Sequence, residues 1–239
     1  MYKEFKLKAP FFEVGPKVYL YGESAVELAK YADSVSEKYG VDIIFTAQYT
    51  DIYTIASQVK NIFVFAQHMD AIEPGRGVGA VLPEALKAAG AVGVMLNHVE
   101  KPLTLAMINR SIKRADEVGL ATMVCADTPE EAASIAQLGP NIVLAESPSL
   151  IGVGKRSAED AAQLRKTNET VRSINPLIRV LHGAGIKDEK DVFNVITDGA
   201  DATGSTSGIL KAEDPFSMLD RMIASVRCAW DERHDVLNI

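Results

Sequence analysis

Short apolar or β-branched runs recur along the chain, and longer segments with helical periodicity separate them. This alternation predicts βα units whose strands form a parallel sheet. The strand candidates are Phe11–Gly15, Asp42–Thr46, Ile62–Ala66, Val92–Leu96, Ala121–Cys125, Ile142–Ala145, Arg179–Leu181 and Ala200–Gly204. The helices expected after them are Ser24–Tyr39, Asp51–Val59, Leu82–Ala89, Leu103–Val118, Pro129–Leu138, Ala158–Ser173, Glu189–Thr197 and Asp214–Ala229. The repeat count favours an α/β fold with a closed (β/α)8 barrel, and a doubly wound open sheet is the alternative.

The length of the chain fits one domain. Its 239 residues are close to the ~250 that are typical of a single α/β barrel. No long linker, low-complexity segment or shift in composition marks a second domain. We therefore expect one barrel domain over residues 1–239, with an N-terminal extension at 1–9 and a C-terminal tail at 231–239.

Charge and composition narrow the classes of partner. A formal net charge of -7 disfavours non-specific nucleic-acid binding, and no apolar run approaches the ~18 residues of a membrane span. The first residues carry lysines but lack the apolar stretch of a secretory signal. Neither Cys125 nor Cys228 has a Cys or His at metal-ligand spacing. We expect a cytoplasmic protein without a metal site, whose partners include neither nucleic acid nor a membrane.

Three polar side chains stand at or just past the ends of predicted strands. Lys17 follows the first strand, His98 the fourth and Glu146 the sixth. Taken singly, each has an ordinary explanation as a surface charge, a structural histidine or a helix cap. Together, a cation, an imidazole and a carboxylate on one rim can bind an anion, polarise a carbonyl and remove an adjacent proton. The sequence thus predicts proton transfer beside a carbonyl group.

Glycine-rich turns follow the last three predicted strands, at residues 151–154, 182–186 and 204–208. Each turn can present backbone N–H groups to an anion. In barrels of this kind, the loops after the seventh and eighth strands form the usual phosphate site. A small phosphorylated molecule is therefore the expected ligand.

Longer segments of the chain together resemble the triosephosphate isomerases, and specifically their short archaeal-type branch. The matching segments are Ala66–Asp70, Val81–Ala85, Leu96–Glu100, Ala145–Gly154, Gly183–Ile186 and Lys211–Pro215. The resemblance extends from about Phe11 to Ala224. It implies a TIM barrel and a cofactor-independent aldose-ketose isomerase that interconverts dihydroxyacetone phosphate and glyceraldehyde 3-phosphate via an enediolate.

The resemblance also implies roles for individual residues. Glu146 corresponds to the catalytic base and His98 to the electrophile that polarises the carbonyl. Lys17 corresponds to the lysine that holds the substrate and the developing negative charge, and Glu100 to the second glutamate of a His-x-Glu motif. Residues 147–157 correspond to a lid. The positions implied to bind phosphate are Gly152, Gly185, Thr206 and Ser207.

The chain departs from the family pattern beside these groups. Gly15 stands where the family has an asparagine, and Val78 where it has a threonine that reaches across a subunit interface. Val99 and Val153 replace a serine and a threonine. Two further hypotheses therefore stay open. In one, small residues at 15 and 78 open space for another short phosphosugar, such as a tetrulose phosphate, in an isomerase or epimerase. In the other, the barrel binds a sugar phosphate without catalysis.

Self-association is a further implication of the resemblance. Triosephosphate isomerases are dimers or, in the short archaeal-type branch, tetramers. The loop Gln67–Gly79 corresponds to the element that interlocks with the partner. We expect a homodimer or homotetramer whose contact is changed at Val78.

Overall fold

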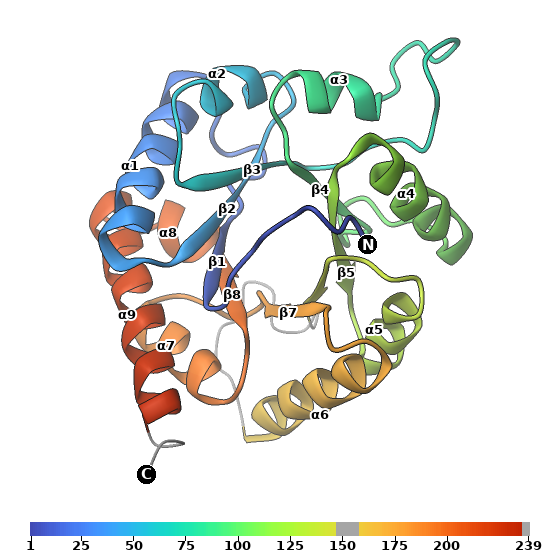
Figure 1. Cartoon of the computed structure of the whole chain (residues 1–239). Helices are drawn as coiled ribbons and strands as arrows, with labels where there is room; N and C mark the ends of the chain where they lie inside the picture. The colour runs from blue at the N-terminus through green and yellow to red at the C-terminus, as the bar shows by residue number, and fades with distance from the viewer. Residues whose placement is uncertain (147–157, 236–239) are drawn as a thin grey trace.

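The computed structural model describes residues 1–146 and 158–235. Its strands pair in parallel and in sequence order, and the eighth returns to the first, so the sheet closes into a barrel (Figure 1). The strands are β1 Phe11–Val14, β2 Asp42–Ala47, β3 Ile62–Ala66, β4 Gly93–Leu96, β5 Ala121–Ala126, β6 Ile142–Ala145, β7 Arg179–His182 and β8 Ala202–Ser205. The closed (β/α)8 barrel expected from the sequence is confirmed, and the open sheet is excluded.

Helices surround the barrel (Figure 1). They are α1 Glu23–Tyr39, α2 Ile52–Ala56, α3 Pro83–Ala88, α4 Leu105–Val118, α5 Pro129–Ala136, α6 Ala158–Ile174, α7 Glu189–Thr197, α8 Ser207–Leu210 and α9 Pro215–Asp235. The short α8 was not predicted, because four residues are too few to show a helical period. None of the described helices is long and apolar enough to cross a membrane.

Local signals set several helix ends. The side chain of Thr128 accepts a hydrogen bond from the backbone N–H of Glu131, and Pro129 occupies the first position of α5. Gly40 and Gly119 adopt the left-handed conformation directly after α1 and α4. Glycine adopts that conformation without the cost that a Cβ imposes. These residues explain why the helix boundaries were close to their predicted positions.

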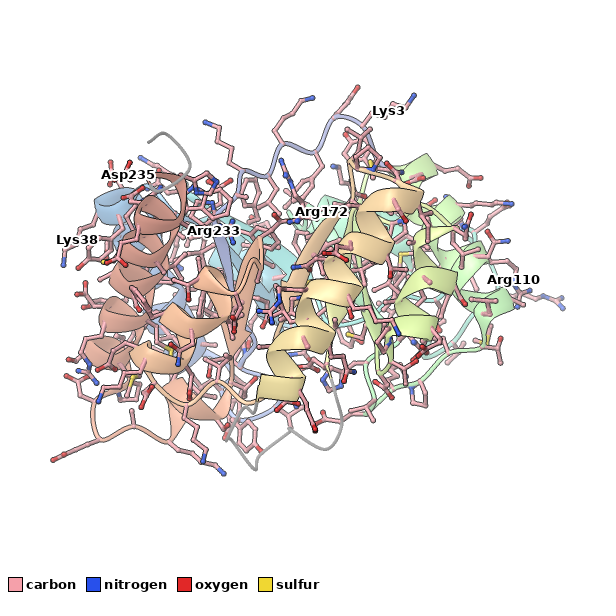
Figure 2. The ribbon with its side chains drawn as sticks, turned by 90° about the horizontal axis from the view of Figure 1, so that it is seen from below. Lys3, Lys38, Arg110, Arg172, Arg233 and Asp235 are labelled. Atoms are coloured by element: carbon pink, nitrogen blue, oxygen red, sulfur yellow. The ribbon has the colours of Figure 1, made fainter. Side chains whose placement is uncertain are left out.

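The last described helix continues into the segment expected to be a C-terminal tail. Residues 231–235 are helical and continue α9. Arg233 donates to the carbonyl oxygens of Ile196 and Ala200, at 2.6 and 2.9 Å, and so satisfies acceptors at the end of α7. Arg172 on α6 pairs with Asp201 at 2.8 Å, and Figure 2 shows both arginines on the same side of the molecule as Lys3. Arg233 thus joins the last described turn of α9 to the backbone at the end of α7.

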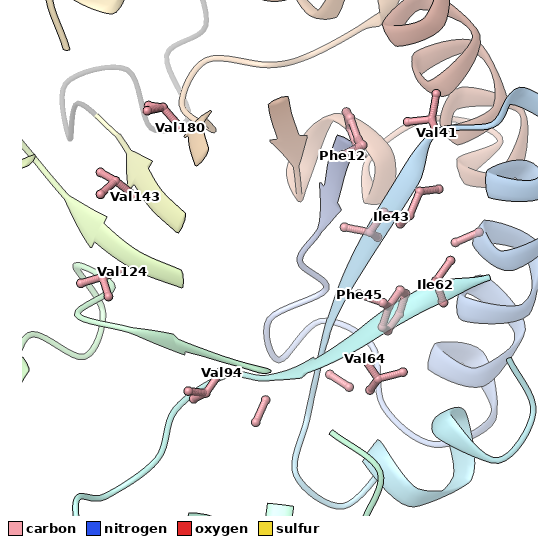
Figure 3. Close-up of a cluster of buried hydrophobic side chains, with 14 of the residues drawn as sticks. Phe12, Val41, Ile43, Phe45, Ile62, Val64, Val94, Val124, Val143 and Val180 are labelled. Carbon is pink, nitrogen blue, oxygen red and sulfur yellow. The ribbon is translucent and has the colours of Figure 1, made fainter. Parts of the chain in front are cut away.

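Two apolar layers hold the barrel together. One lies between the strands and the helices (Figure 3) and includes Phe12, Phe45 and Val64. The other fills the barrel interior with Phe11, Ile44, Phe65, Met95, Met123, Ile142, Leu144 and Leu181 among others. The alternation of adjacent strand residues between these layers follows from the two-residue period of a strand.

The N-terminal extension covers one end of the barrel. It crosses the barrel opening in Figure 1, and the ring of Phe5 packs against Phe63 and Phe65 at centroid distances of 5.2 and 5.7 Å. A Cβ on Gly93 would lie 2.3 Å from the Phe65 ring, so the glycine leaves room for that ring. The amino ends of the strands are thereby closed, which leaves the carboxyl ends for a ligand.

Candidate active site

A cavity of about 470 Å³ lies where the strands end. Of the site residues predicted from the sequence, Lys17, His98, Glu100, Glu146, Gly185, Thr206 and Ser207 line it. Gly152 and the predicted lid at 147–157 lie outside the described residues. Among the described residues, no group of three or more His, Cys, Asp or Glu side chains could hold a metal ion. The barrel topology thus places side chains that are far apart in the sequence, such as Lys17, His98 and Glu146, around one cavity.

The turn after β4 fixes the direction of His98. Asn97 has a φ of 60°, a left-handed conformation that asparagine tolerates better than most residues. Its amide donates to the carbonyl of Cys125 at 3.0 Å, and its side-chain oxygen accepts from the N–H of Leu103 at 2.8 Å. This buried side chain thus ties the turn to β5 and orients the next residue toward the cavity.

Two observations define the protonation of His98. The backbone N–H of Glu100 donates to Nδ1 at 3.1 Å, so Nδ1 is an acceptor and the proton of a neutral ring resides on Nε2. Burial, and secondly the ammonium group of Lys17, lower the pKa of His98 below its usual 6.5. At neutral pH the imidazole is therefore uncharged and offers an Nε2–H donor to the cavity.

Glu146 directly follows β6 and faces His98. Its Oε2 lies 3.6 Å from His98 Nε2, and the two side chains are only 18% and 13% exposed. That separation is too long for a hydrogen bond, so both groups border the same space. A Cβ on Gly183 would lie 2.7 Å from Glu146 Oε1, so the carboxyl group depends on a glycine there.

Burial raises the pKa of Glu146 to about 7. The positive charge of Lys17 opposes this, while Asp127 and Glu100 raise the pKa further. A carboxylate whose pKa is near the ambient pH is well matched to removing a proton from carbon and returning it.

Lys17 and Glu100 form an ion pair at the cavity wall, with Nζ 2.7 Å from Oε1. The backbone of Lys17 has a φ of 50°, an uncommon value for this residue type. The amide of Gln67 donates to the Lys17 carbonyl at 2.8 Å and holds that conformation. Hydrogen bonding to Lys17 is the main cause of the lowered pKa of Glu100. The ammonium group thus lies at the cavity although a proline precedes it.

The turns after β7 and β8 pack closely at the other side of the cavity. The Ser205 hydroxyl donates to the carbonyl of Ile186 at 3.0 Å. A Cβ on Gly208 would lie within 2.8 Å of both Ser205 and the Ile186–Lys187 backbone, so close packing needs glycine there. Lys187 and Lys211 also line the cavity, and the sequence reasoning did not identify either of them.

The hydroxyl of Thr206 has a structural partner. It donates to the carbonyl oxygen of Gly15 at 2.6 Å, which links the turn after β8 to the turn after β1. Ser207 begins α8, directly after Thr206. The contribution of Thr206 to an anion site would therefore come from its backbone, not from its hydroxyl group.

Glu13 is a further lining residue that sequence reasoning missed. It is only 7% exposed, and burial raises its pKa to about 7. A carboxylate within the apolar strand Phe-Phe-Glu-Val was the available signal, because strand alternation places Glu13 on the same inner face as Phe11. Its carboxyl group lies over Gly15, where a Cβ would approach Oε1 to 2.6 Å. The space that a small residue at 15 was expected to open is therefore filled.

Known proteins with similar sequences agree on one family. The family model described as triosephosphate isomerase matches residues 16–223. The chain belongs to the triosephosphate isomerase family. Its relatives include the triosephosphate isomerases of Methanobacterium bryantii, 42% identical over 86% of this chain and 91% of that protein, and of Methanosarcina barkeri, 42% identical over 90% and 97%. The triosephosphate isomerase of Sulfurisphaera tokodaii is 37% identical over 95% of this chain and 100% of its own.

A more distant member of the triosephosphate isomerase family shows the same fold. The crystal structure of triosephosphate isomerase from Bartonella henselae superposes with a TM-score of 0.73 at 18% identity, and covers 89% of this chain and 98% of that one. The archaeal relatives share far more sequence with this chain, which supports its assignment to the archaeal-type branch of the family.

Proposed function

We propose that this protein is a triosephosphate isomerase, which interconverts dihydroxyacetone phosphate and glyceraldehyde 3-phosphate without a cofactor. The observation that carries the proposal is the pairing of Glu146 and His98, whose Oε2 and Nε2 atoms lie 3.6 Å apart at one cavity. One group is a base and the other a neutral donor, and this reaction needs both.

In the proposed reaction, the Glu146 carboxylate removes a proton from the carbon beside the carbonyl group of dihydroxyacetone phosphate. The Nε2–H of His98 donates a hydrogen bond to the carbonyl oxygen as it gains negative charge. Glu146 then returns the proton to the neighbouring carbon, and a proton moves between the two oxygens of the enediolate. Atoms and electrons balance within one molecule, so no oxidant or reductant is consumed.

The remaining charged groups support this chemistry. Lys17 supplies a positive charge beside the developing enediolate, and Glu100 anchors it by the 2.7 Å ion pair. At the other side, the backbone of Gly185 and Ser207 and the ammonium groups of Lys187 and Lys211 provide the donors and charge for a phosphate group. The assignment of Gly152 to the same role stays a prediction from the sequence.

An isomerase assay on purified protein tests the proposal. We expect interconversion of both triose phosphates, in preference to a tetrulose phosphate, because Glu13 fills the space over Gly15. His98→Gln should lower kcat by about 10²- to 10⁴-fold, the usual contribution of an acid-base group. Conversion of neither triose phosphate would contradict the proposal, and a preference for the tetrulose phosphate would favour the other phosphosugar reaction.

We also propose that the protein is a homo-oligomer. Asp70 and Val81 close the base of the loop 71–80 by two hydrogen bonds of 2.9 and 2.7 Å, and Val78 in this loop is fully exposed. Near the mouth of the cavity, Val18 and Tyr19 are 72% and 61% exposed. Adjacent exposed apolar side chains such as Val18 and Tyr19 are typical of contact surfaces. Light scattering should give a dimer or tetramer, and a monomer at all concentrations would contradict this.

The cytoplasm is the proposed location. A phosphorylated triose carries charge that keeps it within the compartment where it is made, so an enzyme acting on it works there. Cell fractionation tests this, and recovery of the protein with membranes or outside the cell would contradict it.

A further inference from the structure

Glu13 is a carboxylic acid inside the barrel. Its neighbours in register are Ile44 on β2 and Gly204 on β8, and it is 7% exposed. Acidic side chains are seldom buried to this extent without a partner or a function. The proton transfer proposed above uses Glu146 and His98 and leaves Glu13 without a role.

The carboxyl group of Glu13 is held on one side and open on the other. The hydroxyl of Thr46 donates to Oε1 at 2.7 Å. Among the described residues, the structure gives a hydrogen-bond partner to Oε1 only, and Glu13 lines the cavity. Oε2 is therefore the oxygen that can meet a ligand.

Two glycines make room for this carboxyl group. A Cβ on Gly15 would lie 2.6 Å from Oε1, and a Cβ on Gly204 would lie 3.0 Å from Oε2. The carboxyl group thus occupies the volume into which a side chain at position 15 would project. This is also where the sequence resemblance led us to expect an asparagine amide.

The charges around Glu13 favour its neutral form. Burial is the main cause of its raised pKa of about 7, and the negative charge of Glu146 adds to it, while Thr46 and Lys17 oppose it. The buried thiol of Cys125 is a further titratable group within electrostatic range of Glu13. Because the negative charge of Glu146 disfavours a second charge on Glu13, the state in which only one of the two carboxyl groups is ionised is favoured near neutral pH.

From this geometry we infer that Glu13 is a substrate-contacting residue, whose protonated carboxyl group donates a hydrogen bond from Oε2 to an oxygen of the phosphosugar beside Lys17. The inference rests on the proposed function for the identity of the ligand. In this arrangement Glu146 must be ionised to act as the base, and Glu13 must keep its proton to act as a donor. The two glutamates then have different roles, Glu146 as the base and Glu13 as a hydrogen-bond donor.

The pH profile of kcat/KM tests whether Glu13 carries a proton in the active enzyme. We expect a bell shape for the wild-type enzyme, in which the decrease on the alkaline side reports ionisation of Glu13. Glu13→Gln keeps a donor of the same size at every pH, so this decrease should disappear. Thr46→Val removes a hydrogen bond that favours the ionised form, so the decrease should move to higher pH. Asp201→Asn, an acid-to-amide change at a buried site paired with Arg172, should leave the profile as in the wild type.

A binding measurement separates this inference from the proposed reaction. Calorimetric titration with dihydroxyacetone phosphate at about pH 8, in buffers of different ionisation enthalpy, reports proton uptake on binding. The wild type should take up protons, and Glu13→Gln should take up fewer. That result without isomerase activity would refute the reaction and keep the contact. An unchanged pH profile and unchanged proton uptake in Glu13→Gln would overturn the inference, and a purely structural role for Glu13 predicts that outcome.

A second pair of variants tests the position of the carboxyl group. Gly15→Asn should lower kcat/KM by at least about tenfold, because the new side chain displaces a group from its position in the site. Adding Glu13→Ala to Gly15→Asn should recover part of the loss, since the two side chains compete for one volume. Losses that simply add in the double variant would contradict this arrangement.

Discussion

Replacing Glu13 by glutamine should change how the stability of the protein depends on pH. The pKa of Glu13 is raised from 4.5 to about 7 in the folded protein, chiefly by burial. The folded state therefore binds a proton that the unfolded state releases between these two pH values. By linkage, the stabilising effect is complete below about pH 4.5 and is lost as the pH rises through about 7.

The magnitude follows from the two pKa values. Each pKa unit corresponds to about 1.4 kcal/mol, so the wild type should lose about 3 kcal/mol of unfolding free energy through Glu13 between about pH 4.5 and pH 8. Glu13→Gln cannot lose this free energy, because the glutamine side chain does not ionise. The unfolding free energy of the variant minus that of the wild type should therefore rise by about 3 kcal/mol over this interval.

Denaturant unfolding at several pH values measures this difference. Glu146 also has a pKa raised to about 7. The experiment should therefore be repeated with Glu146→Gln added to the wild type and to the Glu13→Gln variant. Removing that charge should lower the pKa of Glu13 somewhat and reduce the pH-dependent difference. A difference that stays constant with pH would refute the assignment of a buried, neutral carboxylic acid at position 13.

Three other substitutions test separate parts of the structure. Gly183→Ala should lower kcat by about 10²-fold with a smaller effect on KM, because its Cβ would lie 2.7 Å from Glu146 Oε1; steady-state kinetics measure this, and wild-type rates would contradict it. Arg233→Ala should lower the unfolding free energy by about 1–3 kcal/mol, since it removes two hydrogen bonds from the guanidinium group to backbone carbonyl groups. Phe5→Ala should cost about 2–4 kcal/mol by uncovering the end of the barrel. Denaturant unfolding checks both, and changes below about 0.5 kcal/mol would contradict them.

The sequence was sufficient for the barrel and for the charged groups at strand ends. Apolar runs and helical periods recur with regular spacing, and capping residues such as Thr128 mark helix ends. Lys17, His98 and Glu146 could be assigned to one site because each follows a strand, and the carboxyl ends of parallel strands meet at one face. Local sequence pattern and barrel topology together therefore predict the fold and the position of these three side chains.

The features that the sequence did not predict depend on contacts between distant segments of the chain. The Thr206 hydroxyl donates a hydrogen bond to the carbonyl oxygen of Gly15, 191 residues away in the sequence, and no local sequence pattern predicts this bond. The continuation of α9 to Asp235 is supported by Arg233 reaching the end of α7, which the sequence pattern does not show. Glu13 was missed for a different reason, because its importance depends on its carboxyl group filling the volume over Gly15 and on the Thr46 hydroxyl.

The fate of the substrate hydrogen tests the central claim most directly. Dihydroxyacetone phosphate should be incubated with the protein in deuterium oxide and followed by nuclear magnetic resonance. If Glu146 removes a proton from carbon, the wild type should form glyceraldehyde 3-phosphate and incorporate solvent deuterium at the reacting carbon. Glu146→Gln should lower both rates by about 10²- to 10⁴-fold. Isomerisation by Glu146→Gln at the wild-type rate, or no exchange and no product with the wild type, would contradict the account.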